Sequence, residues 1–501
     1  MDSKRRAVGA QRAVPLRHNL TWASVLLLVL GGLLPACRSA PDPLDAYRLA
    51  LVSSAQDDLG ALADLPRYDI TLTVHLERLL VSGRETVQYT NVTGAPLEEI
   101  VFRLYPNLPH YGGRMTVTTV QVDDQPVTAI TGAEDTALRV PLPTPLLPGR
   151  GVEIELDFTV EVQPVSGDTV FGVGQDILSL PDCYPLLAVR DEEDETGWRT
   201  DVAPPHADAV FSEVALYTVD VIAPEGVVVV GSGTAAEPTA NEDGTRTWHL
   251  AGGPRREFAL LLSADFLTAS TTVDEITVTS YYLPHHSDAG RAALRYGATA
   301  LRIYSELFGP YPYSDFRIVA APLGYRGMEY PGLTLLGLDL YDEWVEELEF
   351  RVVHEVGHQW WYAQVGSDPI REPWLDEGLT EYSAYEYYRL IYGPARADEL
   401  VQTRWRAAYV YAREQEWDAV VGQPASAFGG NYEAMVYAKA ALFFHALRQQ
   451  VGEDVYYDIL RRYLREYRYR TATGADFLAV AEEVSGQDLH PLYAQWIGNP
   501  G

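Results

Sequence analysis

The stretch "EELEFRVVHEVGHQWWYAQ", residues 346–364, decides what kind of domain the second half of this chain forms. Its apolar residues recur every four positions and share one face, which predicts a helix through the stretch. These residues are Leu348, Val352, Val356 and Trp360. His354 and His358 are one helical turn apart, so both imidazoles can reach a single zinc ion. Glu355 can meet a water molecule on that metal, so the stretch predicts a metal-binding helix as well as a core helix.

A second helix start offers a third ligand for the metal. It lies in "EPWLDEGLTEYSAYEYY", residues 372–388, where Glu377 stands 19 positions beyond His358. One helix end, one loop and an antiparallel return would bring its carboxylate to the histidines. Two histidines, one carboxylate and an open fourth position form a catalytic zinc arrangement. Glu381, one turn further on, can orient a ligand histidine through a hydrogen bond, or it is a solvated helix charge.

Composition limits the classes of protein that this chain can represent. Its 501 residues predict two or three domains, and 47% hydrophobic residues predict folded, globular ones. A formal net charge of −32 argues against a nucleic-acid partner, because phosphates would be repelled. The only cysteines are Cys37 and Cys183, so neither a disulfide framework nor a cysteine zinc site is expected. Cys183 is expected to be a buried, small hydrophobic residue.

The first 36 residues have the order of an export signal, with basic residues followed by an apolar run. The run ends at Leu34-Pro35-Ala36-Cys37, which resembles the bacterial lipoprotein signal whose cysteine is acylated. This predicts a lipidated Cys37 and a membrane-anchored lipoprotein that faces the cell exterior or the periplasm. An uncleaved anchor helix or an ordinary signal peptide is the alternative, and each of them exports the rest of the chain.

The remaining sequence changes character twice, which predicts an α+β multidomain protein. Residues 37–66 are expected to be a linker followed by a helix from Leu44 to about Leu62. Residues 67–267 alternate apolar and polar positions between turn signals, which predicts an antiparallel β-sandwich domain. Residues 268–501 begin with mixed strands and helices and continue as a helical bundle, which predicts a second domain with the metal site.

Four motifs together resemble the gluzincin zinc aminopeptidases, the family of aminopeptidase N and leukotriene hydrolase. "HEVGHQWW" and "WLDEGLTEY" match at the family's spacing. "GYRGMEYPGL", residues 324–333, resembles the family's glycine-any-methionine-glutamate-asparagine motif, with Tyr330 in place of asparagine. "NYEAMVYAKAALFF", residues 431–444, resembles its downstream tyrosine segment, where Tyr437 matches the catalytic tyrosine and Tyr432 another.

The resemblance covers about residues 67–500 and implies a β-sandwich domain followed by a thermolysin-like catalytic domain. It implies a short form of the family, without the large C-terminal helical domain. The expected cofactor is one zinc ion per chain, held by His354, His358 and Glu377. The expected activity is that of a zinc aminopeptidase acting on peptides with a free N-terminus. Such a zinc site lowers the pKa of bound water, so that Glu355 can act as general base.

The resemblance also assigns residues that contact the substrate. Tyr437 would donate a hydrogen bond to the oxyanion. Glu329 would pair with the substrate's α-amino group, and its neighbours Gly327 and Met328 would bind the substrate backbone. A second amine-binding group is expected from the β domain, and the candidates are Gln175, Asp176 and Asp182.

Two other functions remain open at this point. The same chemistry would suit an endopeptidase or a hydrolase of another small substrate, which blocking the substrate amine would distinguish from an aminopeptidase. An exported binding or scaffold protein could also retain the fold without the reaction. His285 and His286 are interpreted as surface loop residues without a role in the site.

Overall fold

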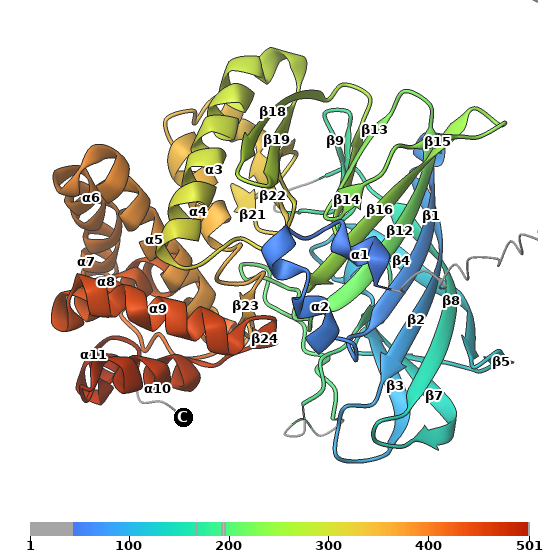
Figure 1. Ribbon diagram of the computed structural model, residues 1–501, viewed down its shortest axis with the longest axis horizontal. Helices are drawn as coiled ribbons and strands as arrows, with labels where there is room; N and C mark the ends of the chain where they lie inside the picture. Colours follow the sequence, from blue (N-terminus) through green and yellow to red (C-terminus); the bar gives the residue numbers. More distant parts are fainter. Residues whose placement is uncertain (1–43, 166–168, 192–193, 195–196, 499–501) are drawn as a thin grey trace, which may run out of the picture. The chain divides into compact units, whose positions relative to one another are not determined.

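The structure is a computed structural model that describes residues 44–165, 169–191, 194 and 197–498 (Figure 1). The predicted export signal and the predicted lipidation site at Cys37 lie outside these residues. Among the helices that the structure describes, none is both long and apolar enough to cross a membrane.

The segment before the first long strand is not the single helix that the sequence predicts. It forms the short helices α1 (Asp45–Arg48) and α2 (Asp58–Ala61), with the 3₁₀ turn η1 (Ser53–Ala55) between them. After a turn at residues 49 and 50, Leu51 forms a β-bridge with Tyr313. The amide of Val52 donates to the carbonyl of Pro312 at 2.9 Å. This bond with a distant part of the chain takes the place of a helical hydrogen bond of Val52, so the helix does not continue.

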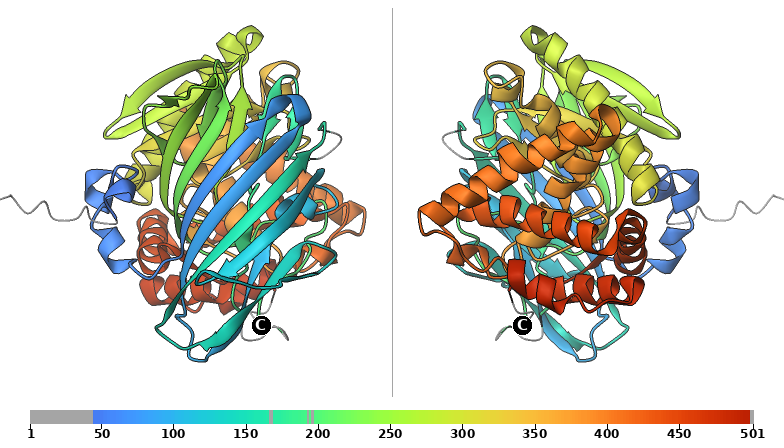
Figure 2. Two further views of the ribbon diagram at one scale, coloured as in Figure 1. Left: turned by 90° about the vertical axis from the view of Figure 1, so that its right-hand side faces the viewer. Right: turned by 90° about the vertical axis from the view of Figure 1, so that its left-hand side faces the viewer.

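A nine-stranded sheet of long, neighbouring strands forms the frame of the N-terminal β domain (Figure 2, left). The strand order is β14-β16-β12-β1-β2-β8-β4-β5, and β15 pairs with β16. The strands are β1 (Arg67–His75), β2 (Leu80–Thr90), β4 (Gly113–Val122), β5 (Gln125–Pro126), β8 (Gly151–Val162), β12 (Ala215–Pro224), β14 (Thr234–Ala235), β15 (Thr239–Ala240) and β16 (Thr245–Arg255). Their alternating burial follows the predicted period of two.

One pairing in this sheet departs from the predicted antiparallel arrangement. β1 and β12 run parallel, with Ile70 opposite Val219. No hairpin joins these two strands, because the chain forms the intervening strands before it returns to β1. Their relative direction is therefore set by that long connection, which permits a parallel pair.

Two four-stranded sheets share a hydrophobic core with the large sheet. The first contains β9 (Gly172–Gly174), β10 (Ile177–Ser179), β13 (Val228–Gly231) and β17 (Leu260–Ser263). The second contains β3 (Leu97–Arg103), β6 (Ile130–Gly132), β7 (Ala137–Leu146) and β11 (Leu186–Leu187). Core side chains such as Val87, Phe102 and Leu260 come from all three sheets. Cys183 is buried in this core, as the sequence predicts.

A different sheet begins at Leu267 and belongs to the second half of the chain. Its order is β18-β19-β20-β22-β21. The strands are β18 (Leu267–Val273), β19 (Ile276–Tyr282), β20 (Asp315–Ala321), β21 (Gly327–Met328) and β22 (Leu333–Gly337). Helix α3 (Ser287–Leu307) packs on this sheet and on α4 (Leu348–Gly357), with Leu301 and Tyr304 fully buried. The short strand β21 lies at the edge of the sheet and carries the Gly327-Met328 segment.

Most of the chain after β22 is helical, and these helices lie on the side away from the large sheet (Figures 1 and 2). They are α5 (Trp374–Tyr392), α6 (Pro394–Leu400), α7 (Ala407–Glu414), α8 (Ala440–Val451), α9 (Glu453–Tyr467), α10 (Gly474–Ser485) and α11 (His490–Trp496). Two further segments are π-helical, η6 (Val401–Arg406) and η8 (Glu433–Lys439). The mixed α+β fold with its β domain first is the predicted fold class.

Helix α4 is shorter than its apolar period predicts, because it ends at Gly357 instead of continuing to Gln364. The short strand β23 (Val365–Gly366) pairs with β24 (Arg470–Thr471), which requires an extended chain soon after the helix. His358 directly follows the helix and keeps a helical backbone conformation, with φ −62° and ψ −14°. The shortened helix therefore still presents both histidines on one side.

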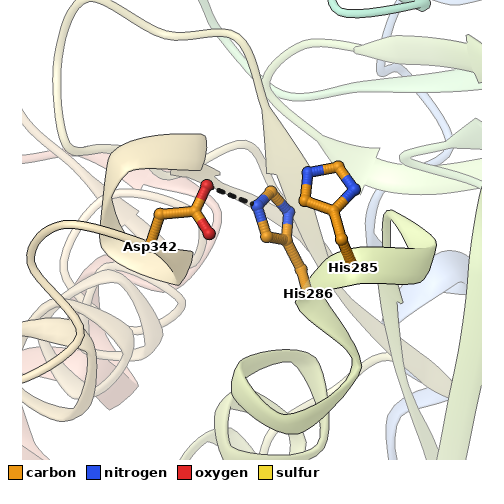
Figure 3. Close-up of side chains that lie close together, drawn as sticks. All are labelled: His285, His286 and Asp342. Carbon is orange, nitrogen blue, oxygen red and sulfur yellow. Dashed lines mark hydrogen bonds and ion pairs between the residues drawn. The ribbon is translucent and has the colours of Figure 1, made fainter.

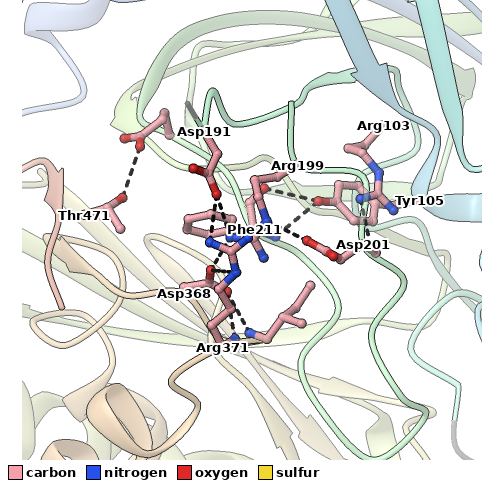
Figure 4. A network of polar contacts seen from close by, with 11 residues as sticks. Arg103, Tyr105, Asp191, Arg199, Asp201, Phe211, Asp368, Arg371 and Thr471 are labelled. Carbon is pink, nitrogen blue, oxygen red and sulfur yellow. Dashed lines mark hydrogen bonds and ion pairs between the residues drawn. The ribbon is translucent and has the colours of Figure 1, made fainter. Parts of the chain in front are cut away.

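The loop between α4 and α5 is tied to the β domain by a polar network (Figure 4). The buried guanidinium of Arg199 pairs with Asp368 of this loop and with Asp201, whose Oδ2 lies 2.5 Å from Nε. Asp191 accepts from Arg371 at 2.8 Å. Asp368 also accepts from the backbone amides of Ile370 and Arg371 at 3.0 Å. The loop that joins the two halves of the predicted metal site is therefore held by contacts outside the catalytic half.

Candidate active site

The predicted metal ligands from α4 and α5 converge in the structure. Nε2 of His354 lies 3.2 Å from Oε2 of Glu377, and Nε2 of His358 lies 3.4 Å from the same oxygen. The two Nε2 atoms are 3.3 Å apart. All three side chains are at least 95% buried. Two histidines on one helix and a glutamate 19 positions beyond the second histidine thus place three ligand atoms around one point.

These distances suit a zinc ion. Ligand atoms at about 2.0–2.1 Å from a tetrahedral zinc ion lie roughly 3.3–3.5 Å from one another. Oε2 of Glu377 is buried and has no hydrogen-bond partner among the described residues. Two imidazole nitrogens and a carboxylate oxygen at this separation would repel one another through their lone pairs unless a cation or a proton lay between them. The donor set of two imidazoles and one carboxylate is that of catalytic zinc sites.

Neighbouring groups fix the orientation of both imidazoles. Nδ1 of His354 lies 2.9 Å from Oε2 of Glu381, and Nδ1 of His358 lies 3.1 Å from the carbonyl oxygen of Trp361. These contacts direct each Nε2 towards the cluster. Glu381 is 4% exposed and also accepts from the indole of Trp405 at 2.7 Å, so it is not a solvated helix charge. Burial raises the pKa of Glu381, but His354 and two arginines outweigh it and hold this pKa at about 2.

Glu355 lies against the bare backbone of β21. A Cβ atom on Gly327 would lie 1.8 Å from Oε1 of Glu355, so only glycine permits this approach. The other carboxylate oxygen, Oε2, is buried and has no hydrogen-bond partner among the described residues. Burial raises the pKa of Glu355 to about 7, against the lowering effect of His354. A carboxylate with this pKa can both accept and return a proton at neutral pH.

The cluster opens into a cleft of about 820 Å³. Its lining includes the predicted site residues His354, Glu355, His358, Glu377, Gly327, Met328, Glu329, Tyr437 and Glu381. The hydroxyl of Tyr437 donates to Oε1 of Glu377 at 2.6 Å. Burial and the adjacent Glu377 raise the pKa of Tyr437 well above its usual value, which keeps this hydroxyl protonated. Tyr432 also lines the cleft, and its buried hydroxyl has no partner among the described residues.

Two further carboxylates line the cleft, Glu329 directly after β21 and Asp208 from the β domain. One oxygen of each lies within 4.8 Å of the other and of an oxygen of Glu377. Burial raises the pKa of both groups, and the negative charge of Glu377 adds to this effect on each. Glu329 also raises the pKa of Asp208. Such mutual repulsion is relieved when a cation enters between the carboxylates.

Asp208 is the residue that the sequence analysis missed. None of the three predicted candidates from the β domain lines the cleft. Gln175 and Asp176 are exposed at the β9–β10 turn, and Asp182 is buried beside Glu257. Asp208 belongs to "PPHADAVF", residues 204–211, which has no strand or helix period. The only sequence feature that could have indicated Asp208 as a site residue is its position beside the apolar run Ala209–Phe211, in a segment outside the predicted strands.

A second group of potential metal ligands lies far along the chain from the first (Figure 3). His286 Nε2 lies 2.8 Å from Oδ2 of Asp342, and the ring centres of His285 and His286 are 4.0 Å apart. The interpretation of both histidines as surface residues is correct for the exposed His285 and wrong for His286, which is 2% exposed. His286 directly precedes α3, and Asp342 is already the hydrogen-bond partner of its Nε2 atom.

The fold and the site together define a zinc-peptidase catalytic domain with a β domain before it. Comparison with known proteins then gives the family, because residues 292–496 match the peptidase family M1 domain. Residues 292–496 therefore form a peptidase family M1 domain, the domain of the gluzincin family of aminopeptidase N that the motifs predict.

Curated relatives are similar over part of their length. Aminopeptidase M1-B of Oryza sativa subsp. japonica is 26% identical over 252 residues, which is 47% of this chain and 28% of the relative. Aminopeptidase M1 of Arabidopsis thaliana is 26% identical over 242 residues, which is 46% of this chain and 28% of the relative. The matched part of the chain thus spans less than a third of these relatives.

Among solved structures, the M1 zinc metallopeptidase of Deinococcus radiodurans has the same fold. Its crystal structure superposes with a TM-score of 0.63 at 21% identity, over 87% of this chain and 94% of that chain. A mutant of the Deinococcus protein has been solved with a bound Tyr-Ser-Ala substrate. The agreement extends over both the β domain and the catalytic domain, which supports the predicted order of the two.

Proposed function

We propose that this protein is a zinc-dependent aminopeptidase that removes N-terminal residues from peptides. The observation that carries this proposal is the pair Asp208 and Glu329, which lies beside the buried cluster of His354, His358 and Glu377. A protonated α-amino group between these carboxylates would relieve their repulsion. It would also place the first peptide bond of the substrate next to Glu355.

Each of the site residues then has a separate role in peptide hydrolysis. Bound to His354, His358 and Glu377, one zinc ion would supply Lewis-acid chemistry for the attacking water and the peptide carbonyl. Glu355 takes a proton from the water molecule while the water oxygen attacks the carbonyl carbon. The same carboxyl group gives the proton to the nitrogen of the breaking C–N bond, which releases the shortened peptide. The open backbone of Gly327 and Met328 lies where the substrate backbone would bind.

Tyr437 is proposed to stabilise the charge that develops on the carbonyl oxygen. Its hydroxyl already lies in the cluster, as a donor to Glu377, and needs only to turn to another acceptor. Glu381 holds the His354 ring through Nδ1, so it acts as a positioning residue.

A panel of aminoacyl amides tests this function directly. We expect release of the N-terminal residue by the purified protein, loss of activity with a chelator, and recovery with added zinc. Acetylation of the substrate amine should remove nearly all activity, because a neutral amide cannot pair with Asp208 and Glu329. Equal rates on free and acetylated substrates would indicate an endopeptidase or another hydrolase. Full activity after Glu355→Gln would rule out the proposed reaction.

We also propose that the protein is exported and that Cys37 anchors it to the membrane as a lipoprotein. The support is the basic and then apolar order of residues 1–36, followed by Leu34-Pro35-Ala36-Cys37. Metabolic labelling with a fatty acid in a bacterial host should mark the wild-type protein and leave Cys37→Ser unlabelled. Labelling of both, or of neither, would contradict acylation at this cysteine.

A further inference from the structure

Both carboxylates and guanidinium groups line the cleft. Asp208 and Glu329 lie close together and near His358. The arginines that line the cleft are Arg326, Arg351 and Arg404. Arg326 directly precedes Gly327 on the chain, and Arg351 lies one helical turn before His354 on α4. In a chain with a net charge of −32, three arginines beside one cleft point to an anionic ligand group.

Among the described residues, Arg351 is the one of these three arginines without an ion pair within 4.0 Å, although its charge still acts on Glu347 and Glu381. Arg404 pairs with Glu347 at 2.8 Å and Glu381 at 3.5 Å, and it lies 3.6 Å from the ring centre of Phe350. Arg326 lies 3.8 Å from Asp339 and stacks over Trp344 at 4.6 Å. Arg351 is half-buried, and its buried Nε atom has no hydrogen-bond partner among the described residues. No hydrogen bond or close ion pair with a described residue would have to break for this guanidinium to bind a ligand.

Helix α4 sets the distance between Arg351 and His358. Arg351 and His358 are seven residues apart, which corresponds to about 10 Å along the helix. An extended peptide advances about 3.3 Å per residue, so about three residues span this distance. Since Glu329 lies beside His358, a substrate whose amine meets Glu329 would bring its third residue near Arg351.

We propose that Arg351 binds a carboxylate at the third residue of the substrate, which in a tripeptide is the C-terminal carboxylate. The inference rests on the proposed aminopeptidase function and adds to it a substrate class, short peptides of about three residues. A guanidinium binds a carboxylate with paired hydrogen bonds, which makes arginine suited to this selection. An acidic side chain on the third residue would offer the same chemistry.

The test compares one tripeptide as the free acid with the same tripeptide as the C-terminal amide. For the wild type we expect kcat/KM to be about tenfold or more higher for the acid. In Arg351→Gln this ratio should fall to about one, and Arg351→Glu should favour the amide. Arg351→Lys should restore part of the ratio. Arg302→Gln, an equal change of charge at an exposed position of α3, should leave the wild-type ratio unchanged.

Further experiments distinguish a C-terminal carboxylate from an acidic side chain as the group that Arg351 binds. They also distinguish failure of this inference from failure of the proposed aminopeptidase activity. Tripeptide amides with Glu or Gln as third residue show whether an acidic side chain also engages Arg351. Dipeptide and tetrapeptide acids should depend less on Arg351 than the tripeptide acid does. Calorimetric binding of the acid and the amide to inactive Glu355→Gln protein tests Arg351 without turnover. Equal affinity for both, or an acid preference that persists in Arg351→Gln, overturns the inference, whereas a wild type without turnover overturns only the proposed activity.

Discussion

Two groups of histidines and carboxylates in this molecule have similar composition and different surroundings. In the first, His354, His358 and Glu377 are buried, and their ligand atoms meet beside a cleft. In the second, His285 and Asp342 are exposed, and only His286 is buried (Figure 3). In the first group each histidine has a partner on Nδ1 that directs Nε2 inward, whereas in the second Asp342 uses the Nε2 of His286 itself.

The difference shows that residue types alone do not define a catalytic metal site. The first group combines buried ligand atoms, supporting partners and access to a cleft with an unpartnered base. The second has the ligand types, but none of its three residues lines the cleft of the first group. The chemistry of a site therefore depends on the second layer of contacts as much as on the ligands.

The largest expected effect separates the two groups directly. His358→Ala should abolish zinc binding and reduce turnover more than about 10,000-fold, because a single histidine and a carboxylate do not hold a catalytic zinc ion. His286→Ala should retain zinc and activity. Metal analysis of dialysed protein and an aminoacyl amide assay measure both. Loss of bound zinc from the His286 variant would contradict the difference drawn between the two groups.

Glu355→Gln should lower turnover about 100- to 10,000-fold, because the amide cannot accept the proton of the attacking water. Zinc content should remain at the wild-type level, since Glu355 is not among the three converging ligands. Asp342→Asn provides the matched removal of a carboxylate in the second group and should keep full turnover. Measuring kcat and bound zinc on the same samples distinguishes a lost base from a lost metal.

Tyr437→Phe should reduce kcat about 100- to 1000-fold, because it removes one donor to the developing oxyanion. The phenyl ring keeps the packing against His354, whose ring centre is 6.0 Å away. An effect on KM alone would contradict the proposed role. Tyr392→Phe removes a hydroxyl of an exposed tyrosine on α5 and should leave kcat unchanged.

Glu381→Gln should weaken zinc binding about 10- to 100-fold, because it removes the negative charge beside Nδ1 of His354. Competition with a chelator of known affinity measures this change. Activity at saturating zinc should recover most of the wild-type value if Glu381 only positions its histidine. An unchanged zinc affinity would show that the support of His354 does not distinguish this site from the second group.

The smallest expected effect concerns a buried carboxylate outside both groups. Glu85 on β2 is fully buried without a hydrogen-bond partner among the described residues, and burial raises its pKa well above the usual value. Above about pH 4.3 the unfolded chain releases this proton while the folded protein retains it, so folding stability falls as pH rises. Glu85→Gln removes this loss and should raise the free energy of unfolding at pH 8 by about 1 kcal/mol or more.

Urea unfolding at pH 5 and pH 8 tests the prediction for Glu85. The stabilisation by Glu85→Gln should be larger at pH 8, while Glu98→Gln, at an exposed position of β3, should have little effect at either pH. An equal difference at both pH values would show that the carboxyl group does not titrate with folding. Turnover should not change, since Glu85 does not line the cleft.

Local periodicity predicted much of this fold. The alternation in β1 and β8, the stripe on α3 and the histidine pair on α4 each depend on neighbours in sequence. The errors occurred where distant residues decide the structure. Pairing with Tyr313 interrupts the expected N-terminal helix, pairing with β24 shortens α4, and a long connection makes β12 parallel to β1.

The same distinction applies to the site. The spacing of His354, His358 and Glu377 was sufficient to predict their convergence, because a helix, a loop and a helix have limited geometries. Asp208 could not be predicted, since it comes from an irregular segment whose path depends on contacts between the two halves of the chain. Arg351 carries no motif, and only the structure shows that it lacks the close ion pairs that Arg326 and Arg404 make among the described residues.

The link between Arg199 and Asp368 gives the metal centre a dependence on the distant β domain (Figure 4). Asp368 stands in the loop between His358 and Glu377, so this ion pair restrains the path by which the third ligand returns. Breaking the contact of the β domain with this loop would then let Glu377 move away from the two histidines before any strand unfolds. The rate at which a chelator removes bound zinc would consequently report on the contact between the β domain and the catalytic domain. A colorimetric assay can measure this rate.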